Sequence, residues 1–321
     1  MNVYDTYFPR NFCGEYVDIK GNSSQLGMFM SVVLGIKPLM DDWIPTDRIA
    51  EFRKTCLRYK LKLREDVIFV NVLKDKLPAN ILGREFLTTT SAFAYPLSSG
   101  QEGQVHVFIS KEEKFLRQGM WYPVIIKNRV IYQPRIDSLK YGYALGYPDC
   151  CIRYFRKYNN WLKYSYLYEA YLSTKGKPSF LCNPFLKDTS FSYIYHMPCS
   201  YSCVSTIKTA GRLRKEIKKR EPQYVKITDN FLRRPFLVLY EKKCYCFEGV
   251  LKGNRVEYKD AIFLSSNTAA NPYAQDLKNA DCIKLEGRRL NFYKGNRLLK
   301  TVYHFSQGSF APEYPFLIDF S

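Results

Sequence analysis

The chain has 321 residues, and its 49 Lys and Arg against 30 Asp and Glu give a formal net charge of +19. A hydrophobic share of 46% excludes a disordered chain, and no stretch approaches the roughly 20 apolar residues of a membrane span. The charge predicts a polyanionic partner such as RNA, because Lys and Arg gain affinity by releasing phosphate counterions. A generally basic proteome is the alternative explanation.

The N-terminal sequence lacks the basic and then apolar pattern of a signal peptide, so a cytoplasmic protein is expected, with no membrane partner. Ten cysteines are too few for a disulfide scaffold at this length, and thiols stay reduced in the cytosol. Clustered cysteines are therefore interpreted as metal ligands or catalytic groups.

Residues 1–134 are predicted to form a mixed α/β region. Helical spacing of Ile49, Phe52 and Cys56 predicts a helix after Pro45, with Cys56 as a packing residue. Period-two patterns predict strands at 66–73 and 104–110, and a hairpin at 121–134 that turns at residues 127–128. His106 lies within the second strand, and a structural role is expected for it.

The rest of the chain divides in two by pattern. Residues 135–223 are predicted to form a Cys-rich helical module, with helices from 137 to about 145, from 152 to 172 and from 204 to 220, and a strand at 191–196. Residues 224–321 alternate apolar and polar residues between Gly-Asn turns, which predicts an antiparallel β-meander. The predicted fold class is therefore α/β (α+β).

Two short blocks in the central module carry the densest chemistry. The block YPDCC ends at Cys151, and the block HMPCSYSC runs from His196 to Cys203. Each block leads into a predicted helix. Free backbone N–H groups and the positive end of the helix dipole stabilise thiolates at such positions.

One shared metal site would use Cys150, Cys151, His196, Cys199 and Cys203 as ligands. A [4Fe–4S] iron–sulfur cluster is the leading hypothesis and zinc is the alternative. Side chains of adjacent cysteines diverge, so Cys150 and Cys151 are expected to have different roles, with Cys151 the stronger candidate. A metal-free dithiol redox pair and plain packing of thiols remain as further interpretations.

Other residues near the blocks are candidates by position. Cys150 and Asp149 are candidate catalytic groups, although Asp149 also suits a helix cap. Arg153, Lys208 and Arg212 are candidate contacts for an anionic substrate. Residues 208–220 contain seven basic residues and one acidic residue, a local net charge of +6, for which a solvated helix face is the alternative explanation.

Three further cysteines are weaker candidates for metal ligands. Cys244 and Cys246 lie two apart in a predicted strand and face the same side, so both thiols could reach one metal, but a structural role is favoured. Cys182 is a minor candidate for an additional ligand.

The combined spacing Gly146-Tyr147-Pro148-x-Cys150-Cys151-x-x-x-Phe155 and His196-x-Pro198-Cys199-Ser200-x-x-Cys203-x-Ser205 resembles a family of uncharacterised archaeal and bacterial proteins. The resemblance covers about residues 135–222. It implies that the two blocks belong to one functional unit, and it carries no reaction.

These observations lead to one main functional hypothesis and two rivals. The main hypothesis is a cytoplasmic iron–sulfur enzyme that performs redox or sulfur chemistry, or that modifies an anionic substrate such as RNA, including tRNA. The rivals are a non-enzymatic nucleic-acid-binding module with a structural zinc, and a metal-free dithiol redox protein.

Overall fold

The computed structural model describes residues 7–69, 104–116, 124–126, 129–132, 138–158, 165–240, 243–265, 271–303 and 315–320. The chain is a mixed α/β protein with antiparallel sheets, which confirms the predicted fold class. It divides into two compact units, one of residues 8–147 and one of residues 1–7 with 148–321. Within the described ranges, no helix is long and apolar enough to cross a bilayer.

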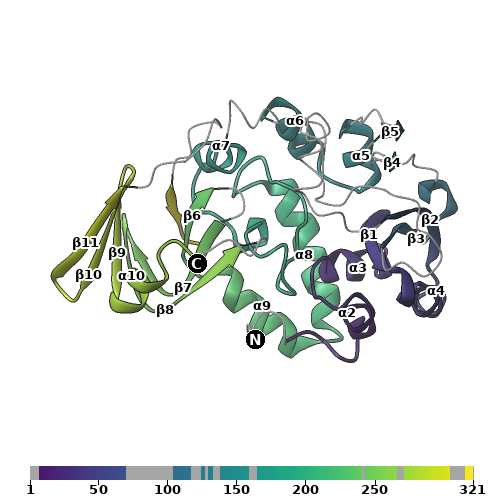
Figure 1. The fold of residues 1–321 in the computed structure, drawn as a ribbon, viewed down its shortest axis with the longest axis horizontal. Coiled ribbons are helices and arrows are strands. Elements are labelled where there is room, and N and C mark those ends of the chain that lie inside the picture. The colour runs from purple at the N-terminus through teal and green to yellow at the C-terminus, as the bar shows by residue number, and fades with distance from the viewer. Residues whose placement is uncertain are drawn as a thin grey trace. The chain divides into compact units, whose positions relative to one another are not determined.

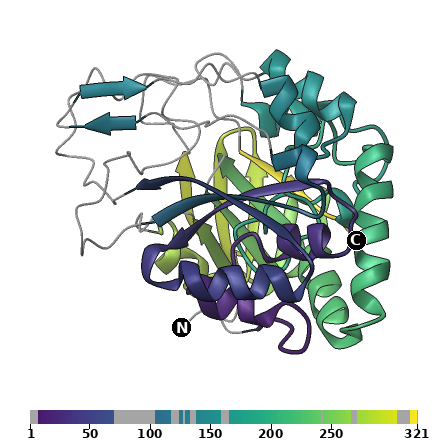
Figure 2. The same cartoon turned by 90° about the vertical axis from the view of Figure 1, so that its right-hand side faces the viewer.

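The unit of residues 8–147 is built on a three-stranded antiparallel sheet in the order β1-β3-β2. Helices α2, α3 and α4 contact this sheet, and Figure 2 shows purple and blue helices lying along one of its faces. The elements of this unit are α2 (Gly14–Lys20), α3 (Leu26–Val33), β1 (Leu39–Pro45), η1 (Thr46–Arg48), α4 (Ile49–Arg58), β2 (Lys62–Phe69), β3 (Gln104–Ser110), η3 (Glu113–Leu116), β4 (Val124–Ile126), β5 (Arg129–Tyr132) and α5 (Ser138–Ala144).

Most predictions for this unit are confirmed within the described residues. The helix after Pro45 forms as η1 and α4, with Phe52 and Cys56 buried, and the strand at 104–110 forms as β3. Strand β2 begins at Lys62, before the predicted start, and the rest of the predicted strand, from residue 70, lies outside the described residues. Strands β4 and β5 pair as the predicted hairpin, whose turn at 127–128 is also outside them.

A buried ion pair joins α2 to β1. The Lys20 ammonium lies 2.6 Å from Asp42, and the two side chains are 7% and 1% exposed. The Tyr16 hydroxyl also donates to Asp42, and the Gln25 amide donates to it at 3.3 Å. Because several donors satisfy this carboxylate, the charge can be held inside the unit.

The other unit combines helices with a seven-stranded sheet in the order β11-β10-β9-β8-β7-β6-β12. Strands β6 to β11 follow one another as the predicted meander, and β12 returns to pair with β6 (Figure 1). The elements are α6 (Asp149–Tyr158), α7 (Tyr166–Leu172), η4 (Phe180–Cys182), α8 (Val204–Lys218), α9 (Pro222–Leu232), β6 (Phe236–Tyr240), β7 (Lys243–Lys252), β8 (Arg255–Ser265), α10 (Ala274–Asn279), β9 (Cys282–Glu286), β10 (Arg289–Lys294), β11 (Arg297–Tyr303) and β12 (Phe316–Ile318).

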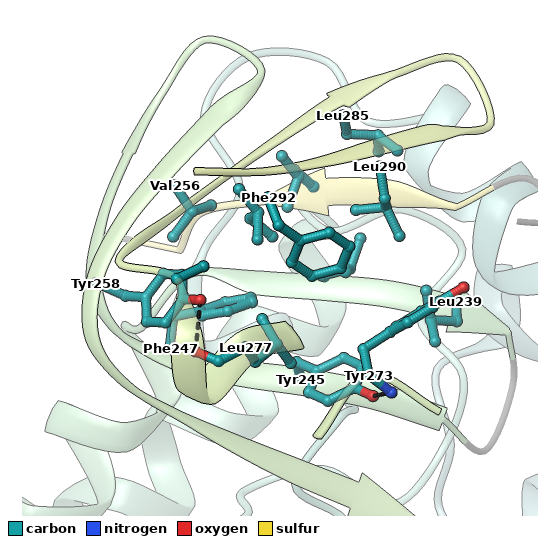
Figure 3. Packing of buried hydrophobic residues seen from close by; sticks show 14 residues of the cluster. Leu239, Tyr245, Phe247, Val256, Tyr258, Tyr273, Leu277, Leu285, Leu290 and Phe292 are labelled. Atoms are coloured by element: carbon teal, nitrogen blue, oxygen red, sulfur yellow. Dashed lines mark hydrogen bonds between the residues drawn. The ribbon is translucent and has the colours of Figure 1, made fainter. Parts of the chain in front are cut away.

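One face of the sheet is covered by an apolar core that includes α10 (Figure 3). Tyr245, Phe247 and Phe292 point into this core and are almost completely buried. The Tyr258 hydroxyl donates to the carbonyl oxygen of Leu277 at 2.9 Å, which ties α10 to the sheet. Aromatic burial of this size is enough to stabilise the sheet without a metal or a disulfide.

Two expected elements differ in the helical part of this unit. The helix expected from 152 to 172 is present in the described residues as α6 and α7, with Ser165 in extended backbone angles before α7, and residues 159–164 lie outside the described residues. Residues 191–196 form no strand. The Ser192 hydroxyl donates to the carbonyl oxygen of Ile194 at 2.7 Å and accepts from its N–H, which closes a local turn.

We expect Asp42→Ala to lower the free energy of unfolding by about 3–5 kcal/mol, because it leaves the Lys20 charge buried without its partner. The matched control is Asp18→Ala, which removes an exposed carboxylate 3.2 Å from Arg10 and should change stability by about 0.5 kcal/mol or less. Urea unfolding followed by circular dichroism measures both. Equal losses in the two variants would contradict this account of the buried pair.

Candidate metal centre

Four cysteines from the two sequence blocks converge on one point. The Sγ atoms of Cys150, Cys151, Cys199 and Cys203 all lie within 4.8 Å of one another. They form the group of Cys, His, Asp or Glu side chains in the described residues whose geometry could hold a metal ion. The expectation that the two blocks build one metal-binding site is therefore supported by their geometry.

Two helix starts bring the sulfur atoms together. Cys150 and Cys151 occupy the first turn of α6, and the N–H groups of Cys151 and Ile152 bond to the carbonyl oxygen of Pro148. Cys203 is the N-cap residue of α8, and Cys199 lies in the turn that precedes it. Pro148 directly precedes α6, where its fixed φ angle suits a helix entry, whereas Pro198 precedes Cys199 in the segment that leads to α8.

The sulfur atoms are spaced as non-bonded neighbours. The Sγ of Cys203 lies 3.6 Å from that of Cys150 and 3.7 Å from that of Cys151, and the two adjacent cysteines are 3.9 Å apart. A disulfide would require about 2.0 Å. Adjacent cysteines thus contribute to the same group of four, although their side chains were expected to diverge.

The four cysteines differ in their exposure to solvent. Cys151 and Cys203 are 2% and 6% exposed, Cys199 is half-buried and Cys150 is exposed. One edge of the group therefore faces solvent at Cys150, and the opposite edge is closed by the protein.

Polar groups approach the buried edge. The Cys199 N–H donates to the Cys151 sulfur at 3.4 Å, and the Thr206 hydroxyl lies 3.4 Å from the same sulfur. His196 Nε2 lies 2.9 Å from the Thr206 hydroxyl oxygen. His196, a predicted ligand, is thus placed behind Thr206, outside the group of four sulfur atoms. Outer contacts of this kind orient the ligands of metal sites.

Thr206 was not identified from the sequence. It lies three residues after Cys203, on the turn of α8 that faces the cysteines, and it is completely buried. Helical spacing from a ligand is the signal that could have found it.

The thiols strongly perturb one another. Hydrogen bonds with Cys199 and Cys203 raise the pKa of Cys151. Hydrogen bonds from Cys151 and Cys199 lower the pKa of Cys203 far below the usual thiol range. A thiolate at Cys203 would be stabilised by hydrogen bonds from its protonated neighbours. A cation would favour further ionisation, because like charges at these distances repel.

The apolar cluster around the site is made largely of sulfur. It contains Cys151, Cys182 and Cys203, with Cys199 and Ile207 partly buried against it. Cys182 lies outside the group of four, and its thiol donates to the carbonyl oxygen of Cys203 at 3.5 Å. Ile207 is the one side chain of this cluster that is not a cysteine, whereas the core of the sheet is built from aromatic and aliphatic side chains.

The remaining candidate residues lie around the site or away from it. Asp149 pairs with Arg153 at 2.6 Å across one turn of α6, with both side chains exposed. Lys208 and Arg212 are exposed on α8. Cys244 and Cys246 are buried in β7 opposite Val238 and Phe236, and Cys56 is buried in the other unit, so none of these three joins the group of four.

No protein-family model, curated protein or solved structure matches this chain.

We expect Thr206→Val to weaken metal binding about tenfold, because the hydroxyl that supports the Cys151 sulfur is lost while the volume is kept. Thr209→Val is the control, because the Thr209 hydroxyl bonds only the Ser205 carbonyl oxygen among the described hydrogen bonds. Competition with a zinc chelator measures both affinities. If both variants bind zinc as tightly as the wild type, Thr206 does not support the site.

Proposed function

We propose that the protein is a zinc-binding protein whose single Zn²⁺ is held by Cys150, Cys151, Cys199 and Cys203. The distances between sulfur atoms carry this proposal. A zinc–sulfur bond of about 2.3 Å in a tetrahedron separates the ligand sulfur atoms by about 3.8 Å. The separations among Cys150, Cys151 and Cys203, at 3.6, 3.7 and 3.9 Å, lie close to that value, and the sulfur atom of Cys199 lies within 4.8 Å of the other three.

The same distances weigh against the iron–sulfur cluster expected from the sequence. Each cysteine of a [4Fe–4S] cluster binds a different iron atom, so the ligand sulfur atoms lie roughly 6 Å apart. All four sulfur atoms here are within 4.8 Å of one another. A mononuclear ion fits this space, and a cube of iron and sulfide would require the two helix starts to separate.

A structural role for the zinc is favoured over a catalytic role. Catalytic zinc sites keep one coordination position open for water or substrate, and four thiolates fill a tetrahedron. Cys150 is then a ligand, and Asp149 is engaged with Arg153, so neither has support as a catalytic residue from its contacts. Of the interpretations drawn from the sequence, the non-enzymatic binding module with structural zinc is the best supported.

What the zinc would stabilise follows from the local packing. Cys150 and Cys203 are 53 residues apart, and the cluster between α6 and α8 contains cysteines and Ile207. Other side chains of this region, such as Tyr154 and Tyr201, are also buried, and metal–thiolate bonds would add a direct link between the two helix starts. A metal-free dithiol protein would need two of these thiols and leaves the convergence of four unexplained.

Elemental analysis and an absorption spectrum of anaerobically purified protein test the proposal. We expect one equivalent of zinc per chain and a colourless protein. Co²⁺ substitution should give the strong visible bands of a tetrahedral thiolate complex. A brown protein with iron and sulfide would overturn the proposal in favour of a cluster, and a protein without metal would overturn both.

Cys203→Ser should lose the zinc and lower the free energy of unfolding, because it removes the ligand at the N-cap of α8. Cys182→Ser is the matched control, since Cys182 belongs to the same buried cluster but lies outside the group of four. Zinc content and thermal unfolding measure both variants. Retention of zinc by Cys203→Ser, or its loss from Cys182→Ser, would show that the ligand set is wrong.

A further inference from the structure

The positive charge of the chain is unevenly compensated. On the C-terminal sheet, six basic side chains each lie within ion-pair distance of an acidic side chain: Lys252, Arg255, Lys284, Arg289, Lys294 and Lys300. On α8, the described ion pairs use Arg214 with Asp229, and Glu216 with Lys219 and Arg220. The other basic residues of α8 take part in none of these pairs, which leaves positive charge on this helix.

Three basic residues of α8 form a stripe, which we call the α8 stripe: Lys208, Arg212 and Lys215. Their spacing of four and three residues places them on one side of the helix, and all three are exposed. None of them takes part in an ion pair with a described residue. The rise of an α-helix puts neighbours in the stripe about 5–6 Å apart along the axis.

Arg214 lies on the side of α8 that packs against the protein, and it takes part in an ion pair. The Arg214 guanidinium contacts both carboxylate oxygens of Asp229, with Nε at 2.9 Å from each, and this pair joins α8 to α9. Leu213 and Ile217 are buried beside it. Packing therefore explains Arg214 and leaves the α8 stripe without a structural role.

More positive charge is attached close to the metal centre. The loop at 173–179 carries the exposed side chains of Lys175 and Lys177. This loop is tied to the cysteine-bearing turn by two hydrogen bonds, from the Ser179 N–H to the Tyr201 carbonyl oxygen and from the Tyr201 N–H to the Thr174 hydroxyl, each 2.8 Å long. The cations of the loop and of α8 thus belong to one module.

The chemistry of this surface fits phosphodiesters better than a lipid bilayer. A helix that binds membranes presents large apolar side chains beside its basic residues. On α8 the exposed large apolar residue is Val204, 78% exposed at the first position of the helix. A row of separate cations without apolar neighbours suits a repeating series of phosphate groups.

We propose that the α8 stripe binds the phosphate backbone of a nucleic acid strand. This binding proposal rests on the proposed function in one respect, because the zinc at Cys203 would fix the start of the helix that presents the stripe. The contacts are electrostatic and independent of base sequence, so affinity should fall steeply with salt.

The test measures fluorescence anisotropy of a labelled, mixed-sequence single-stranded RNA of about 20 nucleotides with the full-length protein at several salt concentrations. The variant is Lys208→Ala/Arg212→Ala/Lys215→Ala. We expect its affinity to fall at least tenfold and the slope of log affinity against log salt to decrease by about 2, because three phosphate contacts are lost. A DNA of the same sequence shows whether the strand is RNA or DNA.

The control is Lys252→Ala/Lys284→Ala/Lys294→Ala, which lowers the net charge by the same amount on the sheet. It should retain most of the affinity. An equal loss in both variants, binding by wild type that does not depend on salt, no binding, or binding to anionic phospholipid vesicles alone would overturn the proposal. Zinc content is measured for each variant. Stripe-dependent RNA or DNA binding by a protein without zinc would retain this proposal and reject the zinc centre.

Discussion

The constraint on which the central module depends is the crowding of four thiols in a space suited to one ion. Sulfur atoms 3.6–3.9 Å apart cannot all be ionised side by side without a cation, and as neutral thiols they contribute little apolar burial. The backbone nonetheless brings them together from two helix starts more than fifty residues apart. A bound cation would make this arrangement favourable, because it would replace repulsion between thiolates with shared coordination.

Elsewhere the protein is stabilised without such a centre. Aromatic and aliphatic side chains on one face of the C-terminal sheet pack against α10, and the N-terminal unit encloses the buried Lys20–Asp42 pair among several hydrogen bonds. Both solutions use conventional burial and pairing. The helices that carry the cysteines also bury side chains such as Tyr154 and Leu213, and an ion held by the four thiols would add a direct link between α6 and α8.

Helices and strands were predicted correctly from the sequence where one hydrophobic periodicity, helical or alternating, dominated a segment. The meander strands alternate apolar and polar residues, and α4 and α8 repeat at helical spacing, so their types were recovered. This prediction failed where local hydrogen bonds override the hydrophobic periodicity. Ser165 has extended backbone angles within an otherwise continuous helical pattern, and the Ser192 side chain turns a β-rich stretch whose residues are buried on all sides. Side-chain partners of this kind are invisible to periodicity.

The four cysteines of the site could be predicted from the sequence, but the distances between their sulfur atoms could not. Two proline-led blocks at helix starts identified the four cysteines, but a cluster and a single ion use the same residue type, and only the distance between sulfur atoms separates them. His196 illustrates the same limit, because nearness in sequence made it a ligand candidate while Thr206 lies between it and the nearest sulfur. The proposed tetrathiolate centre would have no open coordination position, so any function of the module would lie on the surfaces around it. On this module the exposed surface that lacks a structural explanation is the basic side of α8.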